Sequence, residues 1–126
     1  MRLLQEVVDV VPGERAVGQR VARSGDFYFD GHFPDSPVVP AIILIEMIAQ
    51  TGGVAAASAE GGTNTTRPQL RVAAIGPFKF PVAAGPGVTL KATARVVGRL
   101  GLLYKIEGDV TADGCLVASG SLTLAG

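Results

Sequence analysis

The sequence predicts an α+β fold in which one antiparallel sheet of about six strands wraps around a long buried central helix. One apolar segment of helix length, at 40–59, lies between Val- and Leu-rich segments of strand length. The 17 Gly and eight Pro residues follow no fixed period, which indicates tight turns between short strands. With 126 residues, the chain is expected to form a single domain spanning 1–126.

The segments before the helix predict a hairpin and a loop. Strand-like stretches at 2–11 and 15–22 are separated by Pro12-Gly13, a turn signal. Segment 24–39 contains Pro34 and Pro37 among aromatic residues. Proline lacks an N–H and biases the preceding residue toward extended geometry, so a structured loop is expected there.

The helix is predicted to begin at Pro40 and to end near Ala59, because proline suits the first turn. It is apolar on nearly all sides, which is typical of a buried helix or a membrane span. Glu46, Gln50 and the Gly52-Gly53 pair argue against a span. Burial inside the protein is therefore expected.

Four strands are predicted after the helix, at 69–80, 88–97, 102–112 and 116–124. Apolar and polar residues alternate in the second and third, so each has one wet face. Turn candidates at 98–101 and 113–114 make this half an antiparallel meander. A sheet curled around one helix is the hot-dog arrangement, and its open edge strands predict at least a dimer.

Composition excludes several function classes. The 11 basic and 11 acidic residues cancel and form no basic run, so neither nucleic acid nor a membrane surface is an expected partner. The single cysteine, Cys115, cannot form an intrachain disulfide and is expected to be inert. With no apolar leader recognisable at the N-terminus, a cytoplasmic location is expected.

Two residues are candidates for chemistry. His32 is the only histidine of the chain, so a histidine-dependent mechanism has one possible position, although a loop histidine without a catalytic role is the alternative. Glu46 stands among apolar residues of the predicted helix, where a carboxylate loses hydration and needs partners. Such carboxyls gather at functional sites and suit general-acid work, although a buried polar network would also hold one.

Around these residues the sequence resembles a known family. The segments GHFPDSPVVP (31–40) and IEMIAQ (45–50) are similar to the signature of the FabZ-type 3-hydroxyacyl-[acyl carrier protein] dehydratases. The match includes the family's histidine at 32, the two prolines after it and the glutamate at 46, and it extends into FKFPV at 78–82. FabA-type dehydratase/isomerases carry aspartate in place of Glu46, so the resemblance argues against isomerisation as the main activity.

The resemblance implies an activity and a site. It implies dehydration of a (3R)-hydroxyacyl thioester on acyl carrier protein to the trans-2-enoyl thioester, in fatty acid or related lipid biosynthesis, with no cofactor and no metal. His32 and Glu46 would form a coupled acid/base pair, and the backbone N–H of Ala41 would hold the thioester oxyanion. The family places His32 of one subunit against Glu46 of the other, which makes the site a property of a homodimer.

Further expectations follow for the substrate. An apolar tunnel for the acyl chain would be lined by Phe33, Ile45, Ile48 and Phe78, although core packing is an equal alternative for each. Acyl carrier protein is acidic, so a local basic surface is expected; its candidates are Lys79, Arg95, Arg99 and Lys105. The resemblance leaves open the acyl chain length and whether dimers assemble into a trimer of dimers.

The sequence departs from the family pattern in two places. Ala41 replaces the usual glycine, and its Cβ is expected to narrow the pocket and restrict φ. The short Pro-His-Arg segment that opens many relatives is not recognisable before the first strand.

Two other functions compete with the dehydratase: a hot-dog acyl thioesterase, which would use Glu46 to activate water, and a non-catalytic acyl-binding module.

Overall fold

The computed structural model describes residues 3–26, 38–58 and 70–126, and in these ranges its elements follow the predicted order. The elements are β1 (Glu6–Val11), β2 (Arg15–Val21), α1 (Ala41–Ser58), β3 (Arg71–Lys79), β4 (Thr89–Leu100), β5 (Leu103–Ala112) and β6 (Cys115–Ala125). The helix begins and ends within a residue of its predicted bounds, and its predicted burial holds except near its start, where Ile42 is 61% exposed.

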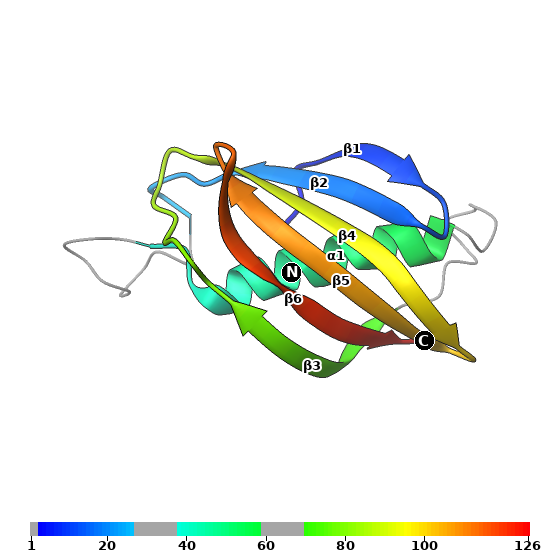
Figure 1. Cartoon of the computed structure of the whole chain (residues 1–126). Helices are drawn as coiled ribbons and strands as arrows, with labels where there is room; N and C mark the ends of the chain where they lie inside the picture. The colour runs from blue at the N-terminus through cyan, green and yellow to red at the C-terminus, as the bar shows by residue number, and fades with distance from the viewer. Residues whose placement is uncertain (1–2, 27–37, 59–69) are drawn as a thin grey trace.

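The strands form one antiparallel sheet in the order β1-β2-β4-β5-β6-β3. Figure 1 shows the sheet curving around α1, which lies along its concave face. The helix packs against β2, β4, β5 and β6. The predicted class, an α+β hot-dog fold, is confirmed.

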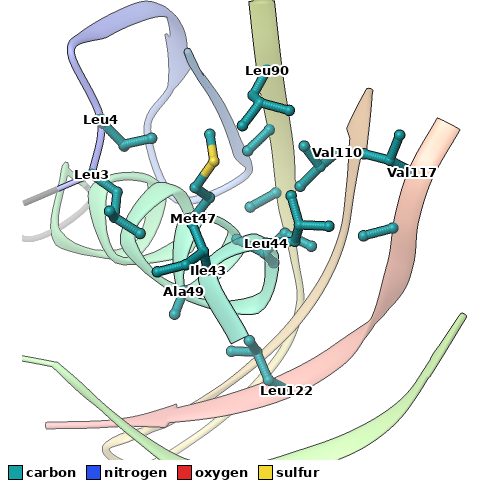
Figure 2. Packing of buried hydrophobic residues seen from close by; sticks show 14 of the residues in the cluster. Leu3, Leu4, Ile43, Leu44, Met47, Ala49, Leu90, Val110, Val117 and Leu122 are labelled. Atoms are coloured by element: carbon teal, nitrogen blue, oxygen red, sulfur yellow. The ribbon is translucent and has the colours of Figure 1, made fainter. Parts of the chain in front are cut away.

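The core lies between α1 and the concave face of the sheet. Along β5, Tyr104, Ile106 and Val110 are buried, whereas Lys105 and Glu107 point to solvent. This alternation follows from the two-residue period of a strand, and it matches the sequence prediction. Figure 2 shows the side chains of the helix and the strands meeting in this layer.

Two glycines let the chain pack closely there. A Cβ at Gly108 of β5 would lie 2.5 Å from Cγ2 of Ile48. A Cβ at Gly18 of β2 would lie 2.7 Å from the side chain of Leu4. Because neither glycine has a Cβ, the helix settles on the sheet and the N-terminal segment settles on β2.

The predicted turn after Val11 also supports the helix. Gly13 has φ of 75°, and its N–H donates to the carbonyl of Ala55 at 2.9 Å. The last carbonyls of a helix have no partner within it. The β1–β2 turn therefore satisfies one of them from outside the helix.

The predicted turn at 98–101 is shifted in the structure. Gly98 stays in the ladder opposite Lys105, beside a bulge, and Leu100 pairs with Leu103. Gly101, at φ of 60°, supplies the left-handed conformation that the tight turn requires. The strand therefore ends three residues later than predicted, because the bulge between Val96 and Gly98 shifts the register without ending the pairing.

Strands β1 and β3 form the two edges of the sheet. On β3, Ile75 is 53% exposed, and Phe80 just beyond the strand is also exposed. An unpaired edge with apolar side chains is a surface to which another strand can add.

The helix in the described part of the chain does not have the length and hydropathy required to cross a membrane.

Candidate active site

Glu46 lies in the second turn of α1 and is half-buried. Gln50 stands one turn later on the same side of the helix, and its Nε2 donates to Oε1 of Glu46 at 3.2 Å. Residues four positions apart are neighbours on a helix surface, which explains the contact. The carboxyl is therefore held in a defined direction by its own helix.

The orientation of the Gln50 amide is set from outside the helix. The backbone N–H of Leu3 donates to Oε1 of Gln50 at 2.8 Å. An amide has an acceptor end and a donor end, so this bond turns Nε2 toward Glu46. Because Leu3 is itself fully buried, the donor is fixed in place.

Glu46 and Gln50 line a cavity of about 740 Å³ beside the helix. The cavity is bounded by the N-terminal segment and β1, by one side of α1 and by the start of β3. Its remaining wall residues are Leu4, Gln5, Glu6, Val7, Ala49, Gly53, Val54, Ala57, Leu70, Arg71, Val72 and Leu124. The wall is mixed, with aliphatic side chains beside polar and charged ones, so it could contact both the apolar and the polar portion of a small molecule.

The N-terminus of α1 is the second chemical feature. Ile43 and Leu44 already direct their N–H groups at the carbonyl of Pro40, at 3.0 and 3.4 Å. Ala41 is exposed at the first helical position, and the N–H groups of a helix's first residues have no acceptor within it. Together with the helix dipole, the N–H groups at the first helical positions can stabilise an anion.

The described segments before and after His32 are both hydrogen-bonded to the same stretch of chain, at 84–87. On one side, the carbonyl of Ala22 accepts from the N–H of Gly87 at 2.6 Å; on the other, the N–H of Val39 donates to the carbonyl of Ala84 at 2.7 Å. Val39 lies two residues before the start of the helix that carries Glu46. His32 itself and Phe33 lie outside the described residues, so their predicted roles stay predictions.

Three other predicted site residues lie away from the cavity wall. Ile48 is fully buried against the sheet, and Ile45 is half-buried and packs against the same core. Phe78 is half-buried on β3; its ring contacts the position of Gly120 and stacks with Phe80 at 6.1 Å between centroids. Their proposed contact with an acyl chain stays a prediction.

Apart from Glu46, the residues that line the cavity were not predicted from the sequence. The contact of Gln50 with Glu46 could have been predicted from the sequence, because Gln50 stands four positions after Glu46 on one helix face. The contact of Leu3 with Gln50 could not, because it is made by a backbone group from 47 residues away.

The four basic candidates occupy different parts of the surface. Arg95 and Lys105 belong to the outer face of the sheet, where Arg95 pairs with Asp109 at 3.6 Å. The guanidinium of Arg99 lies 4.9 Å from the centre of the Tyr104 ring. Lys79 is the exposed last residue of β3, which ends near the start of α1 in Figure 1. Of the four, Lys79 is thus the one at the end of the strand that points toward the start of α1.

Solved structures with the same fold include proteins from two bacteria. The dehydratase heterocomplex ApeI:P of Xenorhabdus doucetiae aligns with a TM-score of 0.71 and 19% identity, over all of both chains. The PaaI protein of E. coli, from the phenylacetic acid degradation operon, aligns with a TM-score of 0.72 and 16% identity, over 95% of this chain and 77% of that one. At these identities the likeness defines the fold, a hot-dog domain.

Sequence comparisons define the family. Residues 1–121 match the model of the FabA-like domain. The 3-hydroxyacyl-[acyl-carrier-protein] dehydratase FabZ of Roseiflexus sp. (strain RS-1) is 34% identical over 123 residues, covering 98% of this chain and 84% of the relative. The chain therefore belongs to the FabA-like family, among the FabZ-type dehydratases. The predicted enzyme class, a hydro-lyase, is confirmed.

Proposed function

We propose that this enzyme converts a (3R)-hydroxyacyl thioester of acyl carrier protein to the trans-2-enoyl thioester, using His32 and Glu46. The observation that carries the proposal is the carboxyl of Glu46, which lies on a largely apolar helix and is held by Gln50 at the wall of a cavity. Relatives named for this reaction, at 32–35% identity, support it.

The reaction needs three groups, and the chain provides candidates for each. The C2–H bond breaks, its electron pair forms the C2=C3 double bond, and the C3–O bond breaks as the hydroxyl leaves as water. His32 and Glu46 together take the C2 proton and supply the proton to the leaving hydroxyl. The backbone N–H of Ala41 stabilises the negative charge that develops on the thioester oxygen.

The acid/base pair is proposed to form between two subunits. The exposed start of α1 at Ile42 and the exposed edge strand β3 provide apolar surface for a second copy. In this arrangement His32 of one protomer acts with Glu46 of its partner, and each homodimer contains two sites.

Mixing two inactive variants tests the shared site. His32→Ala and Glu46→Gln are each expected to be inactive in enoyl-thioester hydration. After subunit exchange, about half of the dimers carry one of each subunit and one intact site, so about a quarter of wild-type activity returns. If subunit exchange is verified by mass spectrometry and no activity returns, the shared site is excluded.

The same assay separates dehydration from hydrolysis. A thioesterase that used Glu46 to activate water would release free thiol and would tolerate His32→Ala. Reversible hydration of the enoyl thioester, without thiol release, is the expected result.

Binding of the acidic carrier protein is proposed to involve Lys79. Lys79→Glu is expected to raise KM for carrier-bound substrate about two- to fivefold at low salt and less at high salt. Lys105→Glu, on the outer face of the sheet, is the matched control and should leave KM unchanged. Equal effects of the two variants would exclude docking beside Lys79.

A further inference from the structure

The hydrogen bonds that hold Glu46 continue beyond Leu3. The Leu3 carbonyl accepts from Nη1 of Arg20 at 3.2 Å, while the Leu3 N–H donates to Gln50. The other terminal nitrogen of Arg20, Nη2, lies 3.0 Å from Oδ1 of Asp26. One continuous chain of polar contacts therefore joins Asp26 and Arg20 to the carboxyl of Glu46, through Leu3 and Gln50.

Arg20 occupies a position in β2 that faces the core. Ala16 and Gly18 are buried at alternate positions of this strand, and Arg20 is the next in the series. Its partner across the ladder is Leu90 of β4, which is fully buried. Directly opposed residues point to the same face of a sheet, so Arg20 lies on the helix side. A charge at such a position must be paired to be tolerated.

The Arg20–Asp26 pair is withdrawn from solvent. Its side chains are 14% and 13% exposed, whereas those of Arg15 and Asp9 on the neighbouring part of the sheet are 47% and 51% exposed. Exposed pairs hold their geometry weakly, and a withdrawn pair with well-placed bonds holds it firmly. The Arg20–Asp26 pair therefore has the properties of a fixed anchor.

Asp26 is fixed at both of its carboxylate oxygens. Oδ2 accepts from the backbone N–H of Arg23 at 2.9 Å, and the N–H of Asp26 donates back to the carbonyl of Arg23 at 2.9 Å. Arg20 is itself held in β2 between β1 and β4. The anchor thus rests on the sheet and on a closed turn, both independent of the helix.

We propose that Arg20 and Asp26 are positioning residues for Glu46, acting through the backbone of Leu3 and the amide of Gln50. The inference rests on the proposed function, because it assumes that Glu46 is catalytic. Loss of the guanidinium removes the charged donor from the Leu3 carbonyl. The Leu3 N–H then holds the Gln50 amide less firmly, and the direction of the Glu46 carboxyl is less well defined. Such a loss is expected to lower kcat and to leave KM nearly unchanged, since neither residue lines the cavity.

Arg20→Met and Arg20→Lys test the proposal in the full-length enzyme, with enoyl-thioester hydration as the assay. Arg20→Met is expected to lower kcat about tenfold, with KM within about twofold of wild type. Arg20→Lys should recover part of the loss, because one ammonium cannot reproduce both contacts of the guanidinium fork. Arg15→Met, which removes the exposed pair on the same strand, is the matched control and should leave kcat unchanged.

A double-mutant cycle with Gln50→Ala shows whether Arg20 acts through Gln50. If it does, the Arg20→Met/Gln50→Ala double variant loses no more kcat than Gln50→Ala alone. Losses that multiply would overturn the proposal, because they would reveal a separate route, such as one through the segment that follows Asp26. Circular dichroism and urea unfolding establish that each variant is folded; if Arg20→Met is not, Arg20→Lys and Asp26→Asn take its place in the cycle.

Glu46→Gln, assayed in parallel, separates this inference from the proposed function. Wild-type turnover by Glu46→Gln would refute the catalytic role of Glu46. An inactive Glu46→Gln together with unchanged kcat in folded Arg20 variants would refute only the positioning role of Arg20 and Asp26.

Discussion

The two faces of helix α1 hold their polar groups differently. On the face toward the sheet, Thr51 is fully buried, and its hydroxyl donates to the Met47 carbonyl of the same helix at 2.7 Å. On the face toward the cavity, Glu46 is bonded to Gln50, which in turn accepts a bond from Leu3 outside the helix. A polar group in closed packing has to be satisfied locally, whereas one beside a cavity can be oriented from a distance and still meet a ligand.

The adjacent glycines Gly52 and Gly53 show the same contrast in packing. A Cβ at Gly52 would lie 3.0 Å from the side chain of Ile106, whereas one at Gly53 would meet nothing within 4 Å. One face of the helix is therefore filled to contact, and the other borders open space. We therefore expect the first face to stabilise the fold, and the proposed function assigns the chemistry to the second.

The largest expected effect is a difference in kcat between variants of Glu46, on the cavity face, and Thr51, on the sheet face. Glu46→Gln should lower kcat for enoyl-thioester hydration by about 10²–10⁴-fold, because the neutral amide cannot exchange a proton. Thr51→Val should leave kcat within about twofold and lower the free energy of unfolding by about 1 kcal/mol, through loss of one hydrogen bond. Comparable losses of kcat in both folded variants would contradict the functional division of the helix.

The next effect compares apolar side chains on the two faces. Ile48→Ala removes a fully buried side chain and should lower the free energy of unfolding by about 2–5 kcal/mol. Val54→Ala, at the cavity wall, should cost about 1 kcal/mol, since its side chain is only half-buried and leaves a smaller void. Urea unfolding measures both, and equal costs would show that the cavity face is packed as tightly as the core.

The smallest effect compares the two glycines. Gly53→Ala should raise the free energy of unfolding by about 0.5–1 kcal/mol, because alanine favours the helix and its Cβ points into open space. Gly52→Ala should lack this gain, because Ile106 must move to admit the methyl group. Thermal unfolding of the pair checks the order; a more stable Gly52→Ala would contradict it.

The fold could be predicted from the sequence because its signals are local. The alternation that buries Ile106 and Val110 is visible within ten residues, and Pro12-Gly13 marks a turn that the structure places there. The turn predicted at 98–101 lies further along the chain in the structure. The sequence did not reveal this, because it offers a glycine at both 98 and 101. Only strand pairing decides that Gly98 lies opposite Lys105 beside a bulge, whereas Gly101 lies in the turn at positive φ.

The site could be predicted only in part. Glu46 was recognisable because it is an acid in an apolar helix, and the structure places it at a cavity wall. The fixed amide of Gln50 was beyond sequence reasoning, because its orientation depends on a backbone group of Leu3. Arg20 interrupts the alternation of β2, but only the fold shows which face of that strand is buried.

Leu3 contributes to the site through its peptide groups, and this has a practical consequence. Replacement of its side chain by another aliphatic one would retain both bonds, so side-chain scanning would report only a packing position. Two replacements remove the Leu3 N–H itself: proline, which has no N–H, and a backbone ester introduced by chemical synthesis. In this enzyme, an engineered library that varies side chains alone would pass over one of the groups that orient the Glu46 carboxyl.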